Sequence, residues 1–408
     1  MNLGMSDRVR PLVEEVREFI ESEVKPVDRE FFDEVDKGDR WKLTPRQYEI
    51  LDSLKLKARE RGLWNFWLTD SDRGYGLNTV EYAYIAEETG LAHLAAEAFN
   101  CSAPDTGNME VLERYGSEEQ KARWLQPLLN GEIRSAFAMT EPGVASSDAT
   151  NISTTAVLEG DEWVINGEKS YISGAGDERC RILIVMVRSD PDNARHQQHS
   201  QILVPMDTPG VEVTRGLNVF SMDDAPHGHM QMTFTDVRVP RDNIILGRGR
   251  GFEISQGRLG PGRVHHCMRA IGMAEKALEL MCKRAVSRTA FGKPLAKLGG
   301  NYDVIANARM NIDMARLLTL QTAWVIDTQG VEEAHWWISK IKTVVPNVAL
   351  KVIDDAIQMH GAFGLSQDFP LAAMYMNART LRLADGPDEV HRMVVARREL
   401  KPYIRKSK

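Results

Sequence analysis

The sequence predicts an α+β protein in which a helical segment, a β segment and a second helical segment follow one another. Residues 1–135 are rich in helix formers, residues 136–245 contain short β-prone runs with hairpin-type turns, and residues 246–408 return to a helical period. A chain of 408 residues, 43% hydrophobic and 27% charged, is long enough for two or three packed domains. We therefore expect three domains with these limits.

The first segment is expected to be helical. Its opening, "MNLGMSDRVRPLVEEVREFIESEV", has the pattern of an amphipathic helix. The run "TVEYAYIAEETGLAHLAAEAF" is rich in Ala, Glu and Leu, and Gly90 within it predicts a break between two helices. A further helix is expected to start at Ser117, in "SEEQKARWLQPLLNGE", and to end at Asn130–Gly131.

The middle segment has the features of a β domain. Gly160–Asp161 and Asn166–Gly167 are typical of tight hairpin turns between short strands. The run "RILIVMVRS" is continuously β-prone, as in a buried strand. In "HMQMTFTDVRVP" apolar residues alternate with others, so we expect Met230, Met232 and Phe234 on one side of a strand that stops at Pro240.

Two polar stretches are expected to connect structured parts. Arg188–Gln201, "RSDPDNARHQQHSQ", is predicted to be a surface loop. Gly247–Glu253, "GRGRGFE", contains glycines that are typical of phosphate loops. It lacks the full Rossmann spacing and context, so we interpret it as a domain junction.

The third segment is predicted to be a helical bundle. In "HHCMRAIGMAEKALELMCKRAVS" apolar residues recur at spacings of three and four, which places them on one helix face. The residues of this face are Cys267, Ile271, Ala274, Leu278, Met281 and Ala285. The runs "NARMNIDMARLLTLQTAWVIDT" and "TVVPNVALKVIDDAIQMHG" continue the helical pattern, and we interpret all these faces as bundle core.

Composition and charge exclude several classes of protein. A net charge of −7 and a pI of about 5.9 argue against nucleic acid as the main partner. The sequence contains no apolar run of membrane-spanning length. The four cysteines are scattered, and His265 and His266 are adjacent and so point about 100° apart on a helix. We therefore expect no metal site.

The N-terminus resembles neither a secretory signal nor a transit peptide. It carries acids early and has no signal-peptide core. The cysteines favour a reducing compartment with free thiols. The expected location is cytoplasmic, with the mitochondrial matrix or the peroxisome as alternatives in a eukaryote.

One short stretch near the C-terminus, "LADGPDEVH", raises a question about its three acids. Asp385, Asp388 and Glu389 surround the pair Gly386–Pro387. Taken alone, the stretch favours a helix start, because Pro suits the first helical position and acids suit the positive end of the helix dipole. The alternative is that one of the acids is a catalytic base.

Four segments together resemble the acyl-CoA dehydrogenase family. "AFAMTEPGVASSD" is similar to the first signature of the family, and "SRTAFGKPL" to its Arg-x-x-Phe-Gly-Lys segment. "QMHGAFG" is similar to its Gln-x-x-Gly loop, and "LADGPDEVHRMVVAR" to its final segment. The matches are in order and span nearly the whole chain. The resemblance implies a helical domain, a middle β-barrel domain, a C-terminal four-helix bundle and an FAD cofactor.

The resemblance assigns cofactor contacts residue by residue. Met139 and Thr140 match positions at the pyrimidine edge of the flavin, Tyr171 to Ser173 match a strand beside the ring, and Tyr171 stands where the family usually has Trp. Arg288 matches the arginine that binds the FAD pyrophosphate across a subunit interface. The full set of cofactor residues is Phe137, Met139, Thr140, Ser146, Tyr171, Ile172, Ser173, Arg288, Phe291, Gln358, Gly361, Ala362, Pro387 and Glu389.

The resemblance also implies the reaction, which is the oxidation of an acyl-CoA thioester between Cα and Cβ to the trans-2-enoyl-CoA. Asp385 aligns with the catalytic base, where most members carry Glu, and would abstract the α proton while flavin N5 takes the β hydride. The substrate-binding residues are expected to be Ser147, Gly260, Arg263 and Gly386. Because the signature loop is one residue longer than usual, Ser146 is the alternative to Ser147 as the substrate-facing serine.

The family resemblance implies two protein partners. Electrons would leave through electron-transferring flavoprotein, and FAD shared between subunits implies a homodimer or homotetramer. A flavin oxidase on the same fold, resembling nitroalkane oxidase or acyl-CoA oxidase, is the alternative function. A non-catalytic interaction protein is the third hypothesis, and the acid at Asp385 argues against it.

Overall fold

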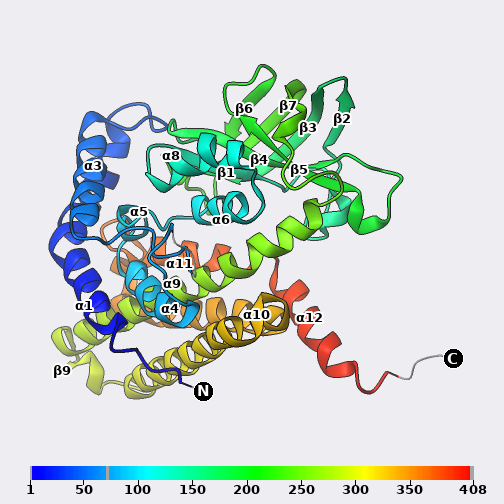
Figure 1. The fold of residues 1–408 in the computed structure, drawn as a ribbon. Coiled ribbons are helices and arrows are strands. Elements are labelled where there is room, and N and C mark those ends of the chain that lie inside the picture. Colours follow the sequence, from blue (N-terminus) through cyan, green and yellow to red (C-terminus); the bar gives the residue numbers. More distant parts are fainter. Residues whose placement is uncertain (1, 70–72, 405–408) are drawn as a thin grey trace. The chain divides into compact units, whose positions relative to one another are not determined.

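The computed structural model describes residues 2–69 and 73–404 (Figure 1). They form two compact units, each built from segments that are distant in sequence. Unit 1 consists of Met1–Lys25, Thr69–Ala96 and Arg263–Lys408, and unit 2 of Pro26–Leu68 and Glu97–Gly262, apart from the residues outside the described ranges. The expected domain limits near residues 135 and 245 stay a prediction.

The helices precede and follow a central series of strands, as the sequence predicts. Before the strands lie α1 (Val9–Phe19), α2 (Lys25–Asp33), α3 (Pro45–Glu60), α4 (Thr79–Glu88), α5 (Ala95–Ala98), α6 (Asp105–Tyr115), α7 (Glu118–Gln120) and α8 (Gln126–Leu129). After the strands lie α9 (Gly251–Ser287), α10 (Asn301–His360), α11 (Leu371–Thr380) and α12 (Asp388–Leu400).

The expected helix limits in the first segment are confirmed. Ser117 caps α7 through a capping box with Gln120, and π-helical residues continue α7 into α8, which ends before Asn130. The predicted break at Gly90 is a short 3-10 turn, Thr89–Leu91, after α4.

Gly90 also has a packing role within unit 1. A Cβ atom on it would lie 2.2 Å from the carbonyl oxygen of Arg269, and one on Gly272 would lie 2.0 Å from that of Glu87. The two glycines therefore allow α4 and α9 to pack at backbone contact distance.

The long helices of unit 1 bury the predicted face of α9. All six residues from Cys267 to Ala285 that were expected on this face are at most 7% exposed. α10 is two helices merged across a kink at Gly330, whose φ of 84° is left-handed. α12 and α11 pack against α10, so the C-terminal part of unit 1 is mainly helical, as expected (Figure 1).

Unit 2 contains a seven-stranded sheet. Its strands are β1 (Arg134–Ala138), β2 (Thr155–Glu159), β3 (Glu162–Ser173), β4 (Cys180–Arg188), β5 (His199–Pro205), β6 (Val211–Gly216) and β7 (His229–Pro240). The order is β1-β4-β2-β3-β7-β6, with β5 paired to β4. β1 and β2 run parallel to β4, and the other pairs are antiparallel.

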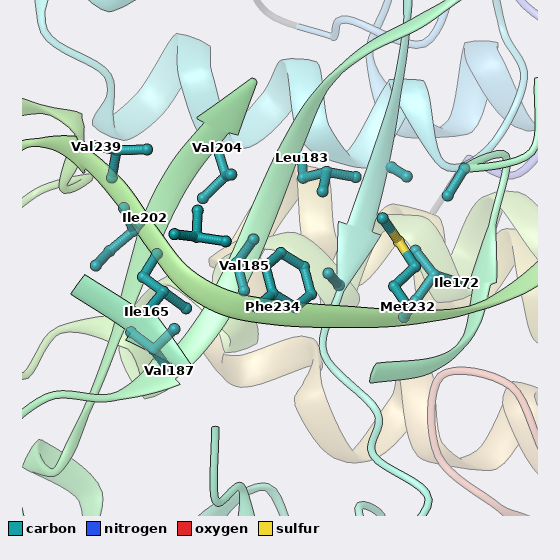
Figure 2. Close-up of a cluster of buried hydrophobic side chains, with 14 of the residues drawn as sticks. Ile165, Ile172, Leu183, Val185, Val187, Ile202, Val204, Met232, Phe234 and Val239 are labelled. Atoms are coloured by element: carbon teal, nitrogen blue, oxygen red, sulfur yellow. The ribbon is translucent and has the colours of Figure 1, made fainter. Parts of the chain in front are cut away.

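The core of the sheet is a single cluster of apolar side chains, drawn in Figure 2. Met230, Met232 and Phe234 are at most 2% exposed and belong to it, which confirms the predicted alternation along β7. The predicted buried strand is β4, which contributes Leu183 and Val185. Because side chains alternate along a strand, one face of each strand points into the curled sheet. Burial of the apolar side chains on that face stabilises the fold.

One predicted turn is wrong. Gly160–Asp161 does connect β2 to β3, but Asn166–Gly167 lies inside the continuous strand β3. The register between β3 and β7 shifts at this point, and the side chain of Asn166 exchanges two hydrogen bonds with Asp236 on β7. The extra residue at this shift is on β7, where Asp236 has a left-handed φ of 48°, so Asn166–Gly167 lies in a strand opposite a β-bulge.

The predicted surface loop is shorter than expected. Its last three residues, His199, Ser200 and Gln201, are at most 1% exposed and belong to β5. Their polar side chains have buried partners: His199 contacts the carbonyl oxygen of Ile152 at 3.0 Å, and Gln201 donates to Ser255 at 2.9 Å. The polar composition therefore concealed a buried strand whose side chains hydrogen-bond to other parts of the chain.

None of the helices within the described ranges is long and apolar enough to cross a membrane.

Candidate functional site

In unit 1 the "LADGPDEVH" stretch covers the end of the loop between α11 and α12 and the first turn of α12. Asp385 and Gly386 both have left-handed backbone conformations, with φ of 54° and 101°. A Cβ atom on Gly386 would lie 2.9 Å from Nε2 of His391, so glycine is needed there for space as well as for φ. The loop thus turns sharply immediately before α12.

Hydrogen bonds hold the Asp385 backbone in place. Arg263 Nε donates to its carbonyl oxygen at 2.8 Å, and Nε2 of His391 lies 3.3 Å from the same oxygen. The side chain of Asp385 is 22% exposed, and its Oδ2 atom lies 3.4 Å from Nε2 of His266. The carboxylate therefore projects from a fixed backbone and remains accessible.

Asp388 has a different environment. It is the first residue of α12, as expected of a helix-start acid, but it is only 2% exposed. Its Oδ2 atom accepts hydrogen bonds from Arg382 Nε at 2.8 Å and Asn347 Nδ2 at 3.0 Å. Burial opposes its ionisation, yet these two donors outweigh burial and lower its pKa. Asp388 is thus committed to structural contacts.

The prediction for the helix start also needs a small correction. Pro387 is the N-cap residue, with extended backbone angles of −71° and 160°, and the first helical residue is Asp388. Proline fits this position because its fixed φ is compatible with the extended conformation.

The surroundings of Asp385 favour neutral histidines. Burial, helped by the positive charges of Arg263 and Lys342, lowers the pKa of His391 to about 4. Burial also lowers the pKa of His266, although Asp385 partly opposes this shift. Both shifts favour the neutral imidazole, in which one nitrogen donates and the other accepts.

In unit 2 the signature loop after β1 is fastened to β3. Thr140 Oγ1 donates to the carbonyl oxygen of Ser170, and the Ser170 N–H donates to the Thr140 carbonyl at 2.8 Å. The ladder between β3 and β7 shifts between Lys169 and Ile172, which leaves Tyr171 with φ of 58° and 61% exposed. A bulge thus places an accessible phenol ring beside the loop.

A buried ion pair lies beneath the same loop. Lys169 Nζ is 2.9 Å from Oε1 of Glu141 and also donates to the carbonyl oxygens of Met139 and Met186. The Glu141 side chain also accepts hydrogen bonds from Ser153 and Thr154. This network fixes the backbone of Met139 and of the Glu-Pro-Gly turn.

The two serines of the loop have different surroundings. Ser146 Oγ accepts a hydrogen bond from the Glu141 N–H at 2.9 Å, whereas Ser147 is exposed. Nearby in unit 2, the Phe137 ring lies 4.0 Å from the guanidinium carbon of Arg258, and Ser173 Oγ lies 2.8 Å from Nδ1 of His229. Ile172 is buried in the sheet core.

Six further predicted site residues lie at exposed positions of unit 1, whereas Gly260 is buried on the part of α9 that belongs to unit 2. Arg288 follows the end of α9, and Phe291 is 97% exposed in the hairpin between β8 (Thr289–Ala290) and β9 (Lys293–Pro294). Gln358 is on the last turn of α10, and Gly361 and Ala362 follow it. Glu389, on α12, is exposed as well.

Unit 1 therefore brings together Asp385, Gly386 and Arg263, and unit 2 brings together Thr140, Tyr171 and the signature loop. Sequence analysis missed His266, His391, Arg382 and Asn347 around the C-terminal loop. The adjacent His265 and His266 were noticed only as poor metal ligands. Their different directions were a usable signal, because one of two adjacent helical histidines can face a site while the other faces the core.

Comparison with known proteins defines the class as a flavoprotein dehydrogenase fold. Models of the acyl-CoA dehydrogenase N-terminal, middle and C-terminal domains match residues 6–132, 136–237 and 249–400. The chain belongs to the acyl-CoA dehydrogenase family. The predicted three-part fold is thereby confirmed.

Individual relatives agree with this assignment. The chain is 54% identical to acyl-CoA dehydrogenase family member 10 of Mus musculus over 98% of its own length. It is also 54% identical to FadE2 of Mycobacterium tuberculosis over 86% of each chain. A solved chain from Mycobacterium abscessus shares 55% identity with a TM-score of 0.95, covering 98% of this chain and 100% of that one.

The relatives differ in length from this chain. It spans between 38% and 52% of the length of the first three relatives, which come from mouse and chicken. Members of the family depend on FAD, and solved chains of the same fold include FAD complexes.

Proposed function

We propose that the chain binds FAD and converts an acyl-CoA thioester to the trans-2-enoyl-CoA, with Asp385 as the base that removes the α proton. The observation that carries this proposal is the contrast between two acids. The backbone of Asp385 is held while its carboxylate stays accessible, whereas Asp388 is buried on Arg382 and Asn347. Only the first arrangement suits a proton acceptor.

The residues of unit 2 fit a flavin. Thr140 is hydrogen-bonded to Ser170 of β3, and the carbonyl oxygen of Met139 accepts from Lys169 of the same strand. Tyr171 presents an exposed ring that can stack on an aromatic system. With Phe137, Ser146, Ile172 and Ser173, they would hold the isoalloxazine end of FAD. When bound, FAD supplies the two-electron oxidant that accepts the β hydride at N5.

The substrate would be positioned by four residues. Ser147 is the exposed serine of the signature loop, which supports it over Ser146 as the serine that faces the thioester. Gly260 and Arg263 lie on α9, and Gly386 follows the base. A backbone N–H beside the base, such as that of Gly386, would polarise the thioester carbonyl and stabilise the negative charge that develops as the proton leaves.

We also propose that the protein is a homodimer or homotetramer in which FAD contacts two chains. Phe291 is 97% exposed at a hairpin tip, and Phe363 and Leu365 beside Ala362 are 45% and 68% exposed. Apolar exposure of this extent favours burial by another chain. Arg288, Gln358 and Gly361 would then reach the FAD of the neighbouring subunit, and Pro387 and Glu389 would contact it near the base.

The experiment that tests this function uses the purified protein and its bound flavin. We expect about one FAD per chain, and anaerobic bleaching by at least one member of a panel of straight and branched acyl-CoAs. Asp385→Asn should keep the flavin, but its flavin should bleach about a hundredfold more slowly or slower still. Asp354→Asn, an exposed acid on α10, is the matched control and should bleach normally. Wild-type bleaching by Asp385→Asn would refute the assignment.

The same preparation identifies the electron acceptor. We propose electron-transferring flavoprotein, so the reduced protein should be reoxidised quickly by that partner and slowly by air. Fast reoxidation by oxygen with release of peroxide would instead support the flavin oxidase, resembling nitroalkane oxidase or acyl-CoA oxidase.

A further inference from the structure

His266 lies on the same face of α9 as Arg263, three residues earlier, and Arg269, three residues later. Arg263 Nε binds the backbone carbonyl of Asp385, and His266 Nε2 lies 3.4 Å from Oδ2 of the same residue. The side chains of His266 and Asp385 are 23% and 22% exposed. One helix face thus contacts both the backbone and the carboxylate of the proposed base.

Arg269 determines which nitrogen of His266 carries the proton. Its Nη2 atom lies 3.4 Å from Nδ1 of His266. A guanidinium group has N–H donors only, so Nδ1 must be the acceptor in this contact. In a neutral imidazole the proton is then on Nε2, which is the nitrogen that faces Asp385.

We propose that His266 is a positioning residue for the base: a neutral imidazole that donates its Nε2–H to the Asp385 carboxylate and is oriented by Arg269. The inference rests on the proposed function of Asp385. A donor on one oxygen would restrict rotation of the short Asp side chain and so hold the carboxylate in one orientation. It would also favour the ionised carboxylate, which is the form that acts as a base.

The charges around His266 agree with a neutral ring. Burial disfavours the imidazolium, and Arg269 on α9 and Lys342 on α10 add positive charge, while Asp385 opposes them. The 3.4 Å separation is long for a hydrogen bond, as is common in catalytic pairs before substrate binds. His265, the neighbouring residue, faces Tyr82 instead, with ring centroids 4.8 Å apart.

The tautomer can be measured without any substrate. Protein labelled with ¹⁵N-histidine should show His266, assigned by comparison with His266→Gln, with a protonated Nε2 and an unprotonated Nδ1 at neutral pH. Asp385→Ala should perturb these two signals, while His265→Gln should leave them in place. A protonated Nδ1 at His266, or an imidazolium at neutral pH, would overturn the proposal.

The effect on the base is tested by the pH dependence of flavin reduction, with whichever panel acyl-CoA bleaches the wild type fastest. His266→Leu should slow reduction about tenfold or more and move the acid limb of the profile upward by about one pH unit. His266→Gln retains an N–H donor and should restore most of the rate and the position of the limb. His265→Gln is the control, and its limb should stay at the wild-type position.

The outcomes separate this inference from the proposed function. If Asp385→Asn abolishes reduction but the limb of His266→Leu matches the wild type, His266 has no positioning role and the base assignment stands. If Asp385→Asn reduces flavin normally, the function itself fails. Far-UV circular dichroism and FAD content of each variant exclude unfolding as the cause of a change in rate.

Discussion

The Nε atom of Arg382 donates a hydrogen bond to Oδ2 of Asp388 at 2.8 Å, and the side chain of Asp388 is only 2% exposed. Asp388→Asn should lower the free energy of unfolding by about 1–3 kcal/mol, since a charge-assisted bond is lost. It should slow flavin reduction far less than Asp385→Asn does. Urea unfolding of the apoproteins and stopped-flow bleaching measure the two effects.

This stabilisation should depend on pH with a definite sign. The folded state lowers the pKa of Asp388, so the contribution is present above the unfolded value of 3.8 and is lost as pH falls through the lower folded value. The difference between wild type and Asp388→Asn should therefore shrink in acid. A difference that is constant across this range would contradict the role of the Arg382 pair.

Gly386→Ala should impair catalysis while leaving FAD bound. The φ of 101° is unfavourable for alanine, and the added Cβ would lie 2.9 Å from His391 Nε2. The loop would have to shift, and the Asp385 carboxylate with it, so we expect the bleaching rate to fall about tenfold or more. Unchanged kinetics in a protein with full flavin content would show that the loop adjusts without moving the base.

Glu141→Gln tests the buried pair under the signature loop. Removing one partner of a buried ion pair leaves the Lys169 ammonium uncompensated, so stability should fall by about 3–5 kcal/mol. Burial opposes ionisation of Glu141, but Lys169, Ser153 and Thr154 outweigh it and hold its pKa at about 2.

The sign of its pH dependence follows from that value. The contribution of Glu141 should be full above about pH 4.5, the ordinary pKa, and should decline as pH falls toward about 2. Chemical unfolding of the two apoproteins at successively lower pH checks this, and equal loss at all pH values would argue for a packing effect.

Gly272→Ala should destabilise unit 1. Its Cβ would lie 2.0 Å from the backbone oxygen of Glu87, which a flexible side chain cannot relieve, and overpacking of this kind typically costs about 1–3 kcal/mol. Gly262→Ala is the control on the same helix, because among the described residues nothing outside its own stretch of helix lies within 4 Å of its added Cβ. That change should be neutral or stabilising, by about 0.5–1 kcal/mol. Differential scanning calorimetry compares the two.

Arg288→Ala should weaken FAD binding while keeping the fold. A guanidinium that pairs with the pyrophosphate contributes about 1.5–3 kcal/mol, which is about ten- to a hundredfold in affinity. Lys283→Ala removes a nearby exposed charge that pairs with Glu279, and should retain flavin. The measurement is the flavin content of each variant after gel filtration. If Arg288→Ala retains all of its FAD, Arg288 does not bind the pyrophosphate.

Much of the fold could be predicted from the sequence because its signals are local. The capping residue Ser117, the alternation through Met230, Met232 and Phe234, and the buried face of α9 all follow from periods and caps that neighbouring residues determine. The order of helices, strands and helices followed from the same signals. The motifs also located Asp385 and Arg288, because each lies in a short recognisable segment.

Only the tertiary structure distinguished Asp385 from Asp388. Both acids precede or begin α12, and nothing within "LADGPDEVH" shows that Arg382 and Asn347 enclose one of them while Arg263 and His266 contact the other. In the same way, Asn166–Gly167 lies within a strand and His199–Gln201 form a buried strand, because residues far along the chain hydrogen-bond to their side chains. Local sequence determined which elements form, while burial and charge at each acid depend on contacts between distant segments, and no local pattern encodes those contacts.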